Sequence, residues 1–401
     1  MSLRIALAMT SLALVGCGAA TFVNDVNFLN RHTQVVIITP SRTSDSLIAV
    51  CPQLQGRVMT STAAGKGGLS YGWINRDLIA SGERRPHINV YGGEDRFWMG
   101  PEGGQYSIFF AKGDPQDLAH WQTPAPFDSE GFDVAKQDVD TVLLRKKMHL
   151  VNASGAAFEL ELQREVRALA PADAGKLLGI LPTSYVRWVG VQSRNKVTNT
   201  SDREWKKESG LLSTWILGQF RPSPETTVVV PFKAGPVEQY GPIVNDAYFG
   251  KVPADRLRIR DGVIYFKGDG LQRSKIGISP RRSLGVMGSY DAENETLTIV
   301  QYHQPKNVVD YVNSMWETQK EPFAGDVANS YNDGPASPGA APFGPFYELE
   351  SSSPALALKP GLSFTHVHTT FHFQGPVEDL NAISLRVLNV TLSQISRAFS
   401  P

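Results

Sequence analysis

Residues 345–373 read PFYELESSSPALALKPGLSFTHVHTTFHF, which is two extended segments separated by the turn pair Pro360-Gly361. Alternate side chains of an extended strand share a face, so Glu348 and Glu350 lie together on the first segment. The second segment places His366, His368, Thr370 and His372 on one face and Val367, Thr369, Phe371 and Phe373 on the other. This period of two predicts β-strands on both sides of the turn.

The rest of the chain repeats this pattern. Residues 158–162 (FELEL) alternate strictly after a turn signal at 152–155. Further strand-like segments lie at 33–39, 186–198, 226–232, 263–267, 284–290 and 296–302. A helical stripe is convincing only after Pro376, where Leu380, Ile383 and Leu388 recur at helical spacing. We therefore expect an all-β fold, a large antiparallel sandwich over residues 33–401 with few short helices and a C-terminal helix.

The N-terminus has the form of an export signal. A weakly basic start, Met1 to Arg4, precedes twelve mostly apolar residues, which are too few to span a bilayer permanently. This predicts a signal peptide at residues 1–16. Gly16 before Cys17 resembles the lipobox of bacterial lipoproteins; an ordinary signal peptide or a buried first strand is the alternative.

The lipobox resemblance implies that Cys17 is acylated and that residues 17–32 form a tether. The protein would then be anchored in the cell envelope, facing the periplasm or the cell surface. Acylation would leave Cys51 as the only thiol, because the chain has 2 cysteines. No intrachain disulfide is then available.

The charge balance excludes one class of partner. The chain has 39 Lys+Arg and 39 Asp+Glu, and its longest basic run is Arg145-Lys146-Lys147. Proteins that bind DNA or RNA need a basic excess to displace counterions from phosphate. We therefore expect no nucleic-acid partner.

Residues 87–110 (HINVYGGEDRFWMGPEGGQYSIFF) carry more polar groups than a core explains. Two Gly-Gly pairs bracket Glu94, Arg96 and Trp98, and glycine pairs allow a backbone to approach a ligand closely. An indole beside carboxylate and guanidinium groups is typical of a sugar site, in which the ring stacks and the polar groups bind hydroxyls. The alternative is a pair of turns with an internal Arg96–carboxylate bridge and Trp98 in the core.

Residues 326–335 (DVANSYNDGP) supply hard oxygen atoms in a turn-rich segment. Asn332 and Asp333 are candidates for binding sugar hydroxyls. Calcium is an alternative ligand, but the spacing departs from the EF-hand loop and lacks its closing Glu. We expect Asx turns, in which Asn and Asp bond their own backbone. No other cofactor is expected.

The two glutamates of residues 345–350 are candidates for proton transfer. Like charges that lie close together raise one pKa, which suits a general acid or base. Three histidines on one strand face are compatible with a transition metal, but no matching cysteine or clear carboxylate ligand accompanies them. The alternative for both groups is a solvated strand face, and we expect no metal.

The C-terminal order resembles the end of galactose mutarotase (aldose 1-epimerase) proteins. The residues that carry the resemblance are Leu349-Glu350, Pro354, Leu358, Pro360-Gly361 and His366. In that family the Leu-Glu strand supplies the catalytic base of a β-supersandwich, which implies Glu350 here, or Glu348 if the register slips. HINVYGG, with His87 and Asn89, is similar to the motif of the family's first histidine.

The family's second histidine has no counterpart, since LLSTWILGQF carries Ser213, Thr214 and Trp215 in its place. The motifs RVMTST, SYGWIN, YGGEDRFW, GPEGG, YNDGP and YELESSSPA are closer to a bacterial lipoprotein branch of the mutarotase-like superfamily. The resemblance spans residues 47–373. It implies the fold more strongly than the activity, because this fold also hosts sugar-binding domains without catalysis.

Three functions follow from these patterns. The first is a membrane-anchored lipoprotein whose cleft binds a carbohydrate through Trp98, Arg96, Glu94, Asn332 and Asp333. The second is a sugar-active enzyme, an aldose 1-epimerase or more remotely a glycosidase or lyase, with Glu348 or Glu350 as base and His87 or His366 as acid. The third is a structural envelope protein, in which the glycines and Trp98 only pack.

Overall fold

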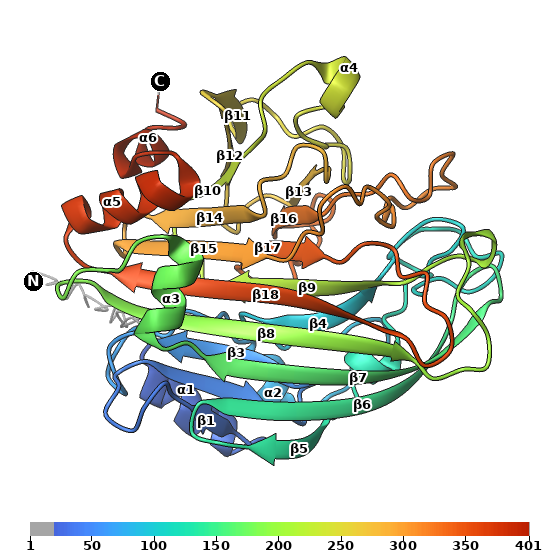
Figure 1. Ribbon diagram of the computed structural model, residues 1–401, viewed down its shortest axis with the longest axis horizontal. Helices are drawn as coiled ribbons and strands as arrows, with labels where there is room; N and C mark the ends of the chain where they lie inside the picture. The colour runs from blue at the N-terminus through green and yellow to red at the C-terminus, as the bar shows by residue number, and fades with distance from the viewer. Residues whose placement is uncertain (1–19, 401) are drawn as a thin grey trace, which may run out of the picture.

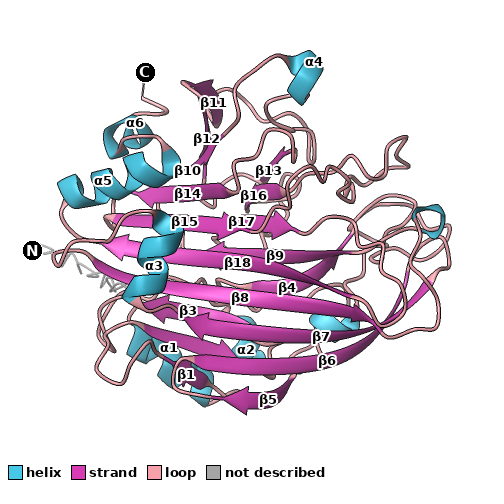
Figure 2. Cartoon of the chain, viewed as in Figure 1, coloured by secondary structure: helices cyan, strands magenta, loops and turns pink. Residues whose placement is uncertain are grey.

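The computed structural model describes residues 20–400, which form two facing antiparallel β-sheets and a small third sheet (Figures 1 and 2). In spatial order the ten-stranded sheet is β11 (Leu257–Arg260), β12 (Val263–Lys267), β10 (Thr226–Pro231), β14 (Val286–Asp291), β15 (Thr296–Tyr302), β18 (Ser363–Gln374), β8 (Arg187–Asn199), β7 (Ala157–Ala168), β6 (Thr141–Val151) and β5 (Asp133–Gln137). The five-stranded sheet is β13 (Ser274–Ile278), β16 (Ala328–Asn332), β17 (Tyr347–Ser352), β9 (Ser213–Phe220) and β4 (Arg96–Gly100). The third sheet is β1 (Val36–Ile38), β2 (Leu47–Cys51) and β3 (Arg57–Thr62).

Helices are few and short. The α-helices are α1 (Phe22–Asn30), α2 (Arg76–Ser81), α3 (Pro171–Leu178), α4 (Val237–Tyr240), α5 (Val377–Leu388) and α6 (Leu392–Ser396), and two 3₁₀ turns span Ala125–Phe127 and Lys207–Ser209. No helix between residues 20 and 400 is long and apolar enough to cross a membrane. The predicted all-β sandwich with few helices is confirmed.

The C-terminal helix is also confirmed. α5 follows Pro376 and ends at Asn389, whose φ of 56° is left-handed. Its buried side chains form one cluster with Phe371 and Phe373 of β18. α3 and α6 join this cluster, so the three helices cover part of the outer face of the large sheet (Figure 1).

The inner face of the large sheet carries a layer of buried polar side chains. Arg164 of β7 is fully buried, donates to Asn195 Oδ1 at 2.6 Å and pairs with Asp95 at 2.5 Å. Ser351 Oγ lies 2.8 Å from both His366 Nε2 and His368 Nδ1. Burial lowers the pKa of His366 to about 3 and that of His368 to about 4, so both imidazoles are neutral at pH 7.

The N-terminal helix differs from the tether expected at residues 17–32. α1 begins at Phe22, and its buried face includes Asp25, which accepts hydrogen bonds from Ser70 at 2.5 Å and Arg221 at 2.9 Å, and pairs with Arg76. The helix is therefore part of the folded body, because a buried carboxylate bonded to two guanidinium groups and a hydroxyl holds it in place. The signal peptide at 1–16 and Cys17 lie outside the described residues.

Cys51 ends β2 and is completely buried as a free thiol. Burial raises its pKa far above the ordinary value of a thiol, because the ionised form would lose its hydration.

The buried pair between β7 and the start of β4 predicts a large stability effect. Arg164→Met leaves Asp95 buried without its partner, so we expect the free energy of unfolding to fall by about 3–5 kcal/mol in urea denaturation. The matched control is Arg194→Met on β8, whose exposed ion pair with Glu165 spans 3.7 Å. That change should cost less than about 1 kcal/mol. Equal effects of the two substitutions would show that the buried pair has no special role.

Candidate functional site

The face of the five-stranded sheet that is turned away from the large sheet carries a compact cavity. Glu348 of β17 lies opposite Gln219 of β9 and Tyr331 of β16, and Tyr331 lies opposite Lys275 of β13. Residues directly opposite each other in an antiparallel ladder point to the same face. The polar and charged residues that line the cavity are Arg96, Glu102, Gln219, Arg273, Lys275 and Glu348.

Aromatic rings form most of the remaining wall. They are Trp98, Trp121, Trp215, Trp316, Tyr331, Phe249, Phe343 and Phe346. The cavity volume is about 70 Å³, which is room for about two waters. Ligand pockets usually hold about 300–1,000 Å³, so this cavity is smaller than a usual ligand pocket in the described conformation.

Two ion pairs cross this sheet face. Arg96 donates to Glu348 Oε1 at 2.7 Å, and its guanidinium lies 4.5 Å from the centre of the Trp98 ring. Lys275 pairs with Glu350 Oε2 at 3.0 Å, and the same oxygen accepts from Trp215 Nε1 at 2.9 Å. Each carboxylate therefore has a cation supplied by a different strand.

One member of each ion pair, Glu348 and Lys275, has a raised pKa. Burial raises the pKa of Glu348 to about 8, although Arg96 opposes the shift, and the charge of Glu350 raises it further. Burial acts to lower the pKa of Lys275, but the charges of Glu350, Glu102 and Glu348 outweigh it and the pKa is raised. At neutral pH the site therefore holds a protonated Glu348 beside a charged Lys275.

Glu102, on the loop after β4, also lines the cavity, and burial raises its pKa above the ordinary value of a carboxyl. A site with two carboxyl groups whose pKa values are raised by burial has the parts for general acid–base chemistry. Within residues 20–400, no histidine lines this cavity.

Several buried polar atoms at the cavity have no hydrogen-bond partner among the described residues. They are Arg96 Nε, Trp98 Nε1, Trp121 Nε1, Arg273 Nε, Trp316 Nε1 and Gln219 Oε1. Buried polar atoms in folded proteins are nearly always bonded to protein or to ordered water. Five donors and one acceptor are thus free to bind a ligand or water.

The structure brings together three of the predicted site residues, namely Glu348, Arg96 and Trp98. Glu350 is fully buried behind the cavity wall and reaches the site through Lys275 and Trp215. Trp98 packs with other rings at centroid distances of 5.3 Å (Phe109) to 6.4 Å (Trp121), and Arg96 covers part of it. Trp98 is thus a core side chain that also lines the cavity.

Three other predicted residues lie apart from this cluster. His87 is exposed, and its Nδ1 lies 2.8 Å from the carbonyl oxygen of Trp121. Glu94 lies 3.0 Å from His372 Nε2 in the layer between the sheets, and His366 belongs to the same layer. Strand alternation predicts which side chains share a face, but not whether that face lies between sheets or in a cavity.

Asn332 and Asp333 organise the chain around the site instead of lining it. Asn332 Oδ1 accepts from Gly270 N at 2.8 Å. Asp333 Oδ2 accepts from Gly344 N at 2.8 Å and so closes the neck of the loop that carries Phe343 to the cavity. Within residues 20–400, no group of three or more His, Cys, Asp or Glu is arranged to hold a metal ion, which gives the calcium alternative no support.

Sequence reasoning missed the residues that complete the site, above all Lys275, Gln219, Trp121 and Trp316. Two of them carried a weak signal. Lys275 is the one charge in the strand SKIGI, and Gln219 is the only amide in STWILGQF. A single polar side chain inside an apolar strand indicates a buried partner or a ligand.

Comparisons with known proteins place the chain by fold. Residues 20–399 match a family of unknown function, DUF6786. No curated protein matches the chain.

Among solved structures, the Slr1438 protein of Synechocystis is similar with a TM-score of 0.51 and 12% identity, covering 86% of this chain and 96% of that one. A candidate aldose 1-epimerase from Escherichia coli K12 has a TM-score of 0.49, 14% identity and coverage of 86% and 100%. A galactose mutarotase-like protein from Lactobacillus casei has a TM-score of 0.47, 11% identity and coverage of 85% and 100%. The expected mutarotase-like fold is confirmed, and at these identities the likeness concerns the fold alone.

The raised pKa of Glu348 predicts a pH dependence of stability. The folded state binds this proton more tightly than the unfolded chain, whose carboxyl has a pKa of 4.5. The resulting stabilisation is complete below about pH 4.5 and is lost as the pH rises to about 8, with a slope of at most about 1.4 kcal/mol per pH unit. We expect the free energy of unfolding of the wild type, relative to Glu348→Gln, to fall across this window in urea titrations.

Glu225→Gln, at an exposed turn, is the matched control and should give a curve parallel to that of the wild type. A Glu348→Gln curve that is also parallel would mean that Glu348 ionises normally in the folded protein.

Proposed function

The chain belongs to DUF6786, a family of unknown function, and we propose that the cavity on its five-stranded sheet binds a carbohydrate. The observation that carries this proposal is the set of buried polar atoms without partners at the cavity, among them Arg96 Nε, Trp98 Nε1 and Gln219 Oε1. A ligand that both donates and accepts hydrogen bonds from several directions would satisfy all of them. Sugar hydroxyls do both, and the indole walls suit the apolar faces of a sugar ring.

The charges at the site fit the same ligand. Lys275 and Glu350 already form a pair, so a neutral ligand can bind without leaving the charge of Lys275 uncompensated. Hydrogen bonds between a charged group and a sugar hydroxyl are stronger than those between two neutral groups.

Binding requires the cover of the cavity to move. Leu118, Trp316 and Phe343 lie on loops at its rim, and the volume of about 70 Å³ is too small for a sugar ring. The loop between Asp333 and Gly344 is the segment expected to move, because hydrogen bonds among Asp333, Gly344 and Phe346 hold only its neck, while its tip belongs to no strand.

Attachment to the membrane is part of the proposal. An acylated Cys17 would stand five residues before α1, which begins at Phe22. At about 3.5 Å per residue, the folded body would then lie within about 20 Å of the bilayer surface. A carbohydrate of the cell envelope is within reach of such a protein.

The test of binding is calorimetry of a soluble form that starts at Thr21, with a panel of mono- and oligosaccharides. A sugar that binds only the folded state must also raise the melting temperature. We expect Trp98→Phe to weaken the binding of such a sugar about tenfold, because it removes one donor at the cavity and keeps an aromatic ring.

Trp205→Phe is the matched control. Trp205 is equally buried, also has an unpartnered Nε1, and packs against Phe158 away from the cavity. Its substitution should leave the dissociation constant unchanged. No binding of any sugar at millimolar concentration would contradict the proposal and favour a structural role.

A second candidate function, sugar epimerisation of the aldose 1-epimerase type, is favoured by the protonated state of Glu348. Mutarotation needs one proton removed from the anomeric hydroxyl and one donated to the ring oxygen. Glu348 would donate, and Glu102, the second carboxyl that lines the cavity, would accept. These carboxyls would replace the imidazole acid expected from the sequence.

Polarimetry of freshly dissolved aldoses tests this reaction. We expect Glu348→Gln to reduce kcat at least 100-fold with little change in KM, since glutamine keeps the shape but cannot donate a carboxyl proton. The rate of the wild type should fall above about pH 8, where Glu348 loses its proton. An unchanged rate in Glu348→Gln would leave binding as the only function of this cavity.

A further inference from the structure

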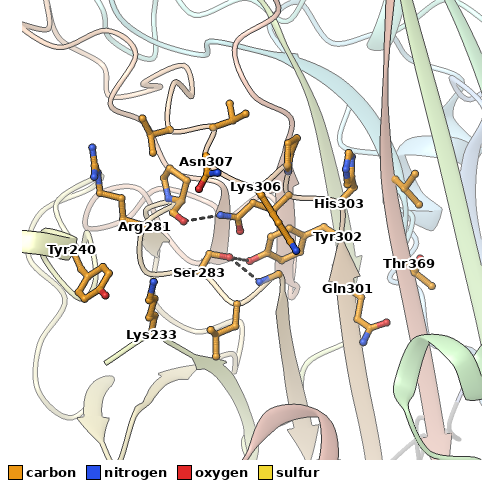
Figure 3. A pocket seen from close by; sticks show the side chains of 18 of the residues that line it. Lys233, Tyr240, Arg281, Ser283, Gln301, Tyr302, His303, Lys306, Asn307 and Thr369 are labelled. Atoms are coloured by element: carbon orange, nitrogen blue, oxygen red, sulfur yellow. Dashed lines mark hydrogen bonds between the residues drawn. The ribbon is translucent and has the colours of Figure 1, made fainter. Parts of the chain in front are cut away.

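A second and much larger pocket, of about 820 Å³, lies on the outer face of the large sheet (Figure 3). Its floor includes Gln301 of β15 and Thr369 of β18, which pair directly in the ladder. Thr369 shares its face with Phe371 and Phe373, the side chains covered by the helices. The cavity on the five-stranded sheet is therefore on the other side of the sandwich.

The pocket is positively charged. Lys233, Arg281 and Lys306 line it and are exposed, and none of the three forms an ion pair with the described chain. No Asp or Glu of residues 20–400 belongs to its wall. Three cations that share one hollow without a counter-charge create a local positive potential, although the chain as a whole is neutral.

The backbone segments that carry the cations are held in place by a buried arginine. Arg282 is fully buried and donates to the carbonyl oxygens of Lys233 (2.9 Å), Gly235 (3.0 Å) and Gly241 (2.7 Å). It thereby fixes the segment that carries Lys233 and Tyr240 next to Arg281. Lys233 Nζ lies 4.5 Å from the centre of the Tyr240 ring.

The segment that forms the opposite wall is hydrogen-bonded to the turn that carries Arg281. Gln304 Nε2 donates to the carbonyl oxygen of Pro280 at 2.6 Å, which holds the segment carrying Lys306 beside Arg281. In Figure 3, Lys233, Tyr240 and Arg281 lie on one side of the pocket and Gln301, His303 and Thr369 on the other. The neighbouring side chains are amides, hydroxyls and apolar groups, including Gln192, Gln301, Asn307, Ser283, Leu284 and Val309.

We propose that this pocket binds an acidic saccharide of about two or three rings that carries carboxylate or phosphate groups. Three unpaired cations on a fixed scaffold match several negative groups on one ligand. The amides and hydroxyls suit sugar hydroxyls, and the Tyr240 ring with the apolar side chains suits the C–H faces of sugar rings. The site is separate from the cavity that contains Glu348 and does not depend on its function.

The experiment is calorimetry of the soluble chain at low salt with trigalacturonate, and with neutral maltotriose as the probe of matched size. We expect trigalacturonate to bind at least tenfold more tightly than maltotriose, and the difference to shrink between about 20 mM and about 200 mM salt, because exposed charges are screened. The double variant Arg281→Gln/Lys306→Gln should weaken the binding of trigalacturonate at least tenfold.

The matched control is Lys251→Gln/Lys359→Gln, which removes two exposed lysines outside the pocket and should leave the affinity unchanged. Trp98→Phe should also leave it unchanged, which separates this site from the first cavity. The proposal is overturned if trigalacturonate does not bind, if maltotriose binds equally well, or if both double variants have the same effect. Inorganic phosphate that binds as tightly as trigalacturonate would show a simple anion site and would overturn the saccharide assignment.

Discussion

The burial of two carboxyls on one face of β17 is the constraint on which the five-stranded sheet depends. Glu348 and Glu350 are two residues apart on β17, and both are buried. A buried carboxyl needs partners for its oxygen atoms whether or not it keeps its proton, and β17 has no cation of its own. The neighbouring elements must supply them, so Arg96 comes from β4 at one edge of the sheet and Lys275 from β13 at the other.

That constraint also explains how far sequence reasoning could go. Alternation in β17 and β18 was sufficient to place the glutamates on one face and the histidines on another, and both groupings are seen. Alternation is a local property, however, and the partner of Glu350 lies 75 residues earlier in the chain. Which strand neighbours which is decided by long-range pairing, so Lys275 and Gln219 could not be assigned to Glu348 and Glu350 in advance.

The histidines of β18 show the same limit of sequence reasoning. In a sequence, a polar strand face indicates either a solvated surface or a set of metal ligands. In β18 this face instead contacts a second layer of polar groups between two sheets. His366 and His368 share Ser351 as a neutral partner. Neutral imidazoles bonded to a hydroxyl avoid the cost of burying a charge, and such an arrangement is visible only once both sheets are in place.

The burial of Cys51 protects its thiol from oxidation in the folded protein. The thiol is sealed in the small third sheet and holds its proton strongly, so it is neither a nucleophile nor accessible to an oxidant while the protein is folded. Oxidation of this thiol is then a risk only before β2 and β3 pair. Rapid closure of that hairpin would protect the newly made chain from cross-linking to its neighbours through Cys51.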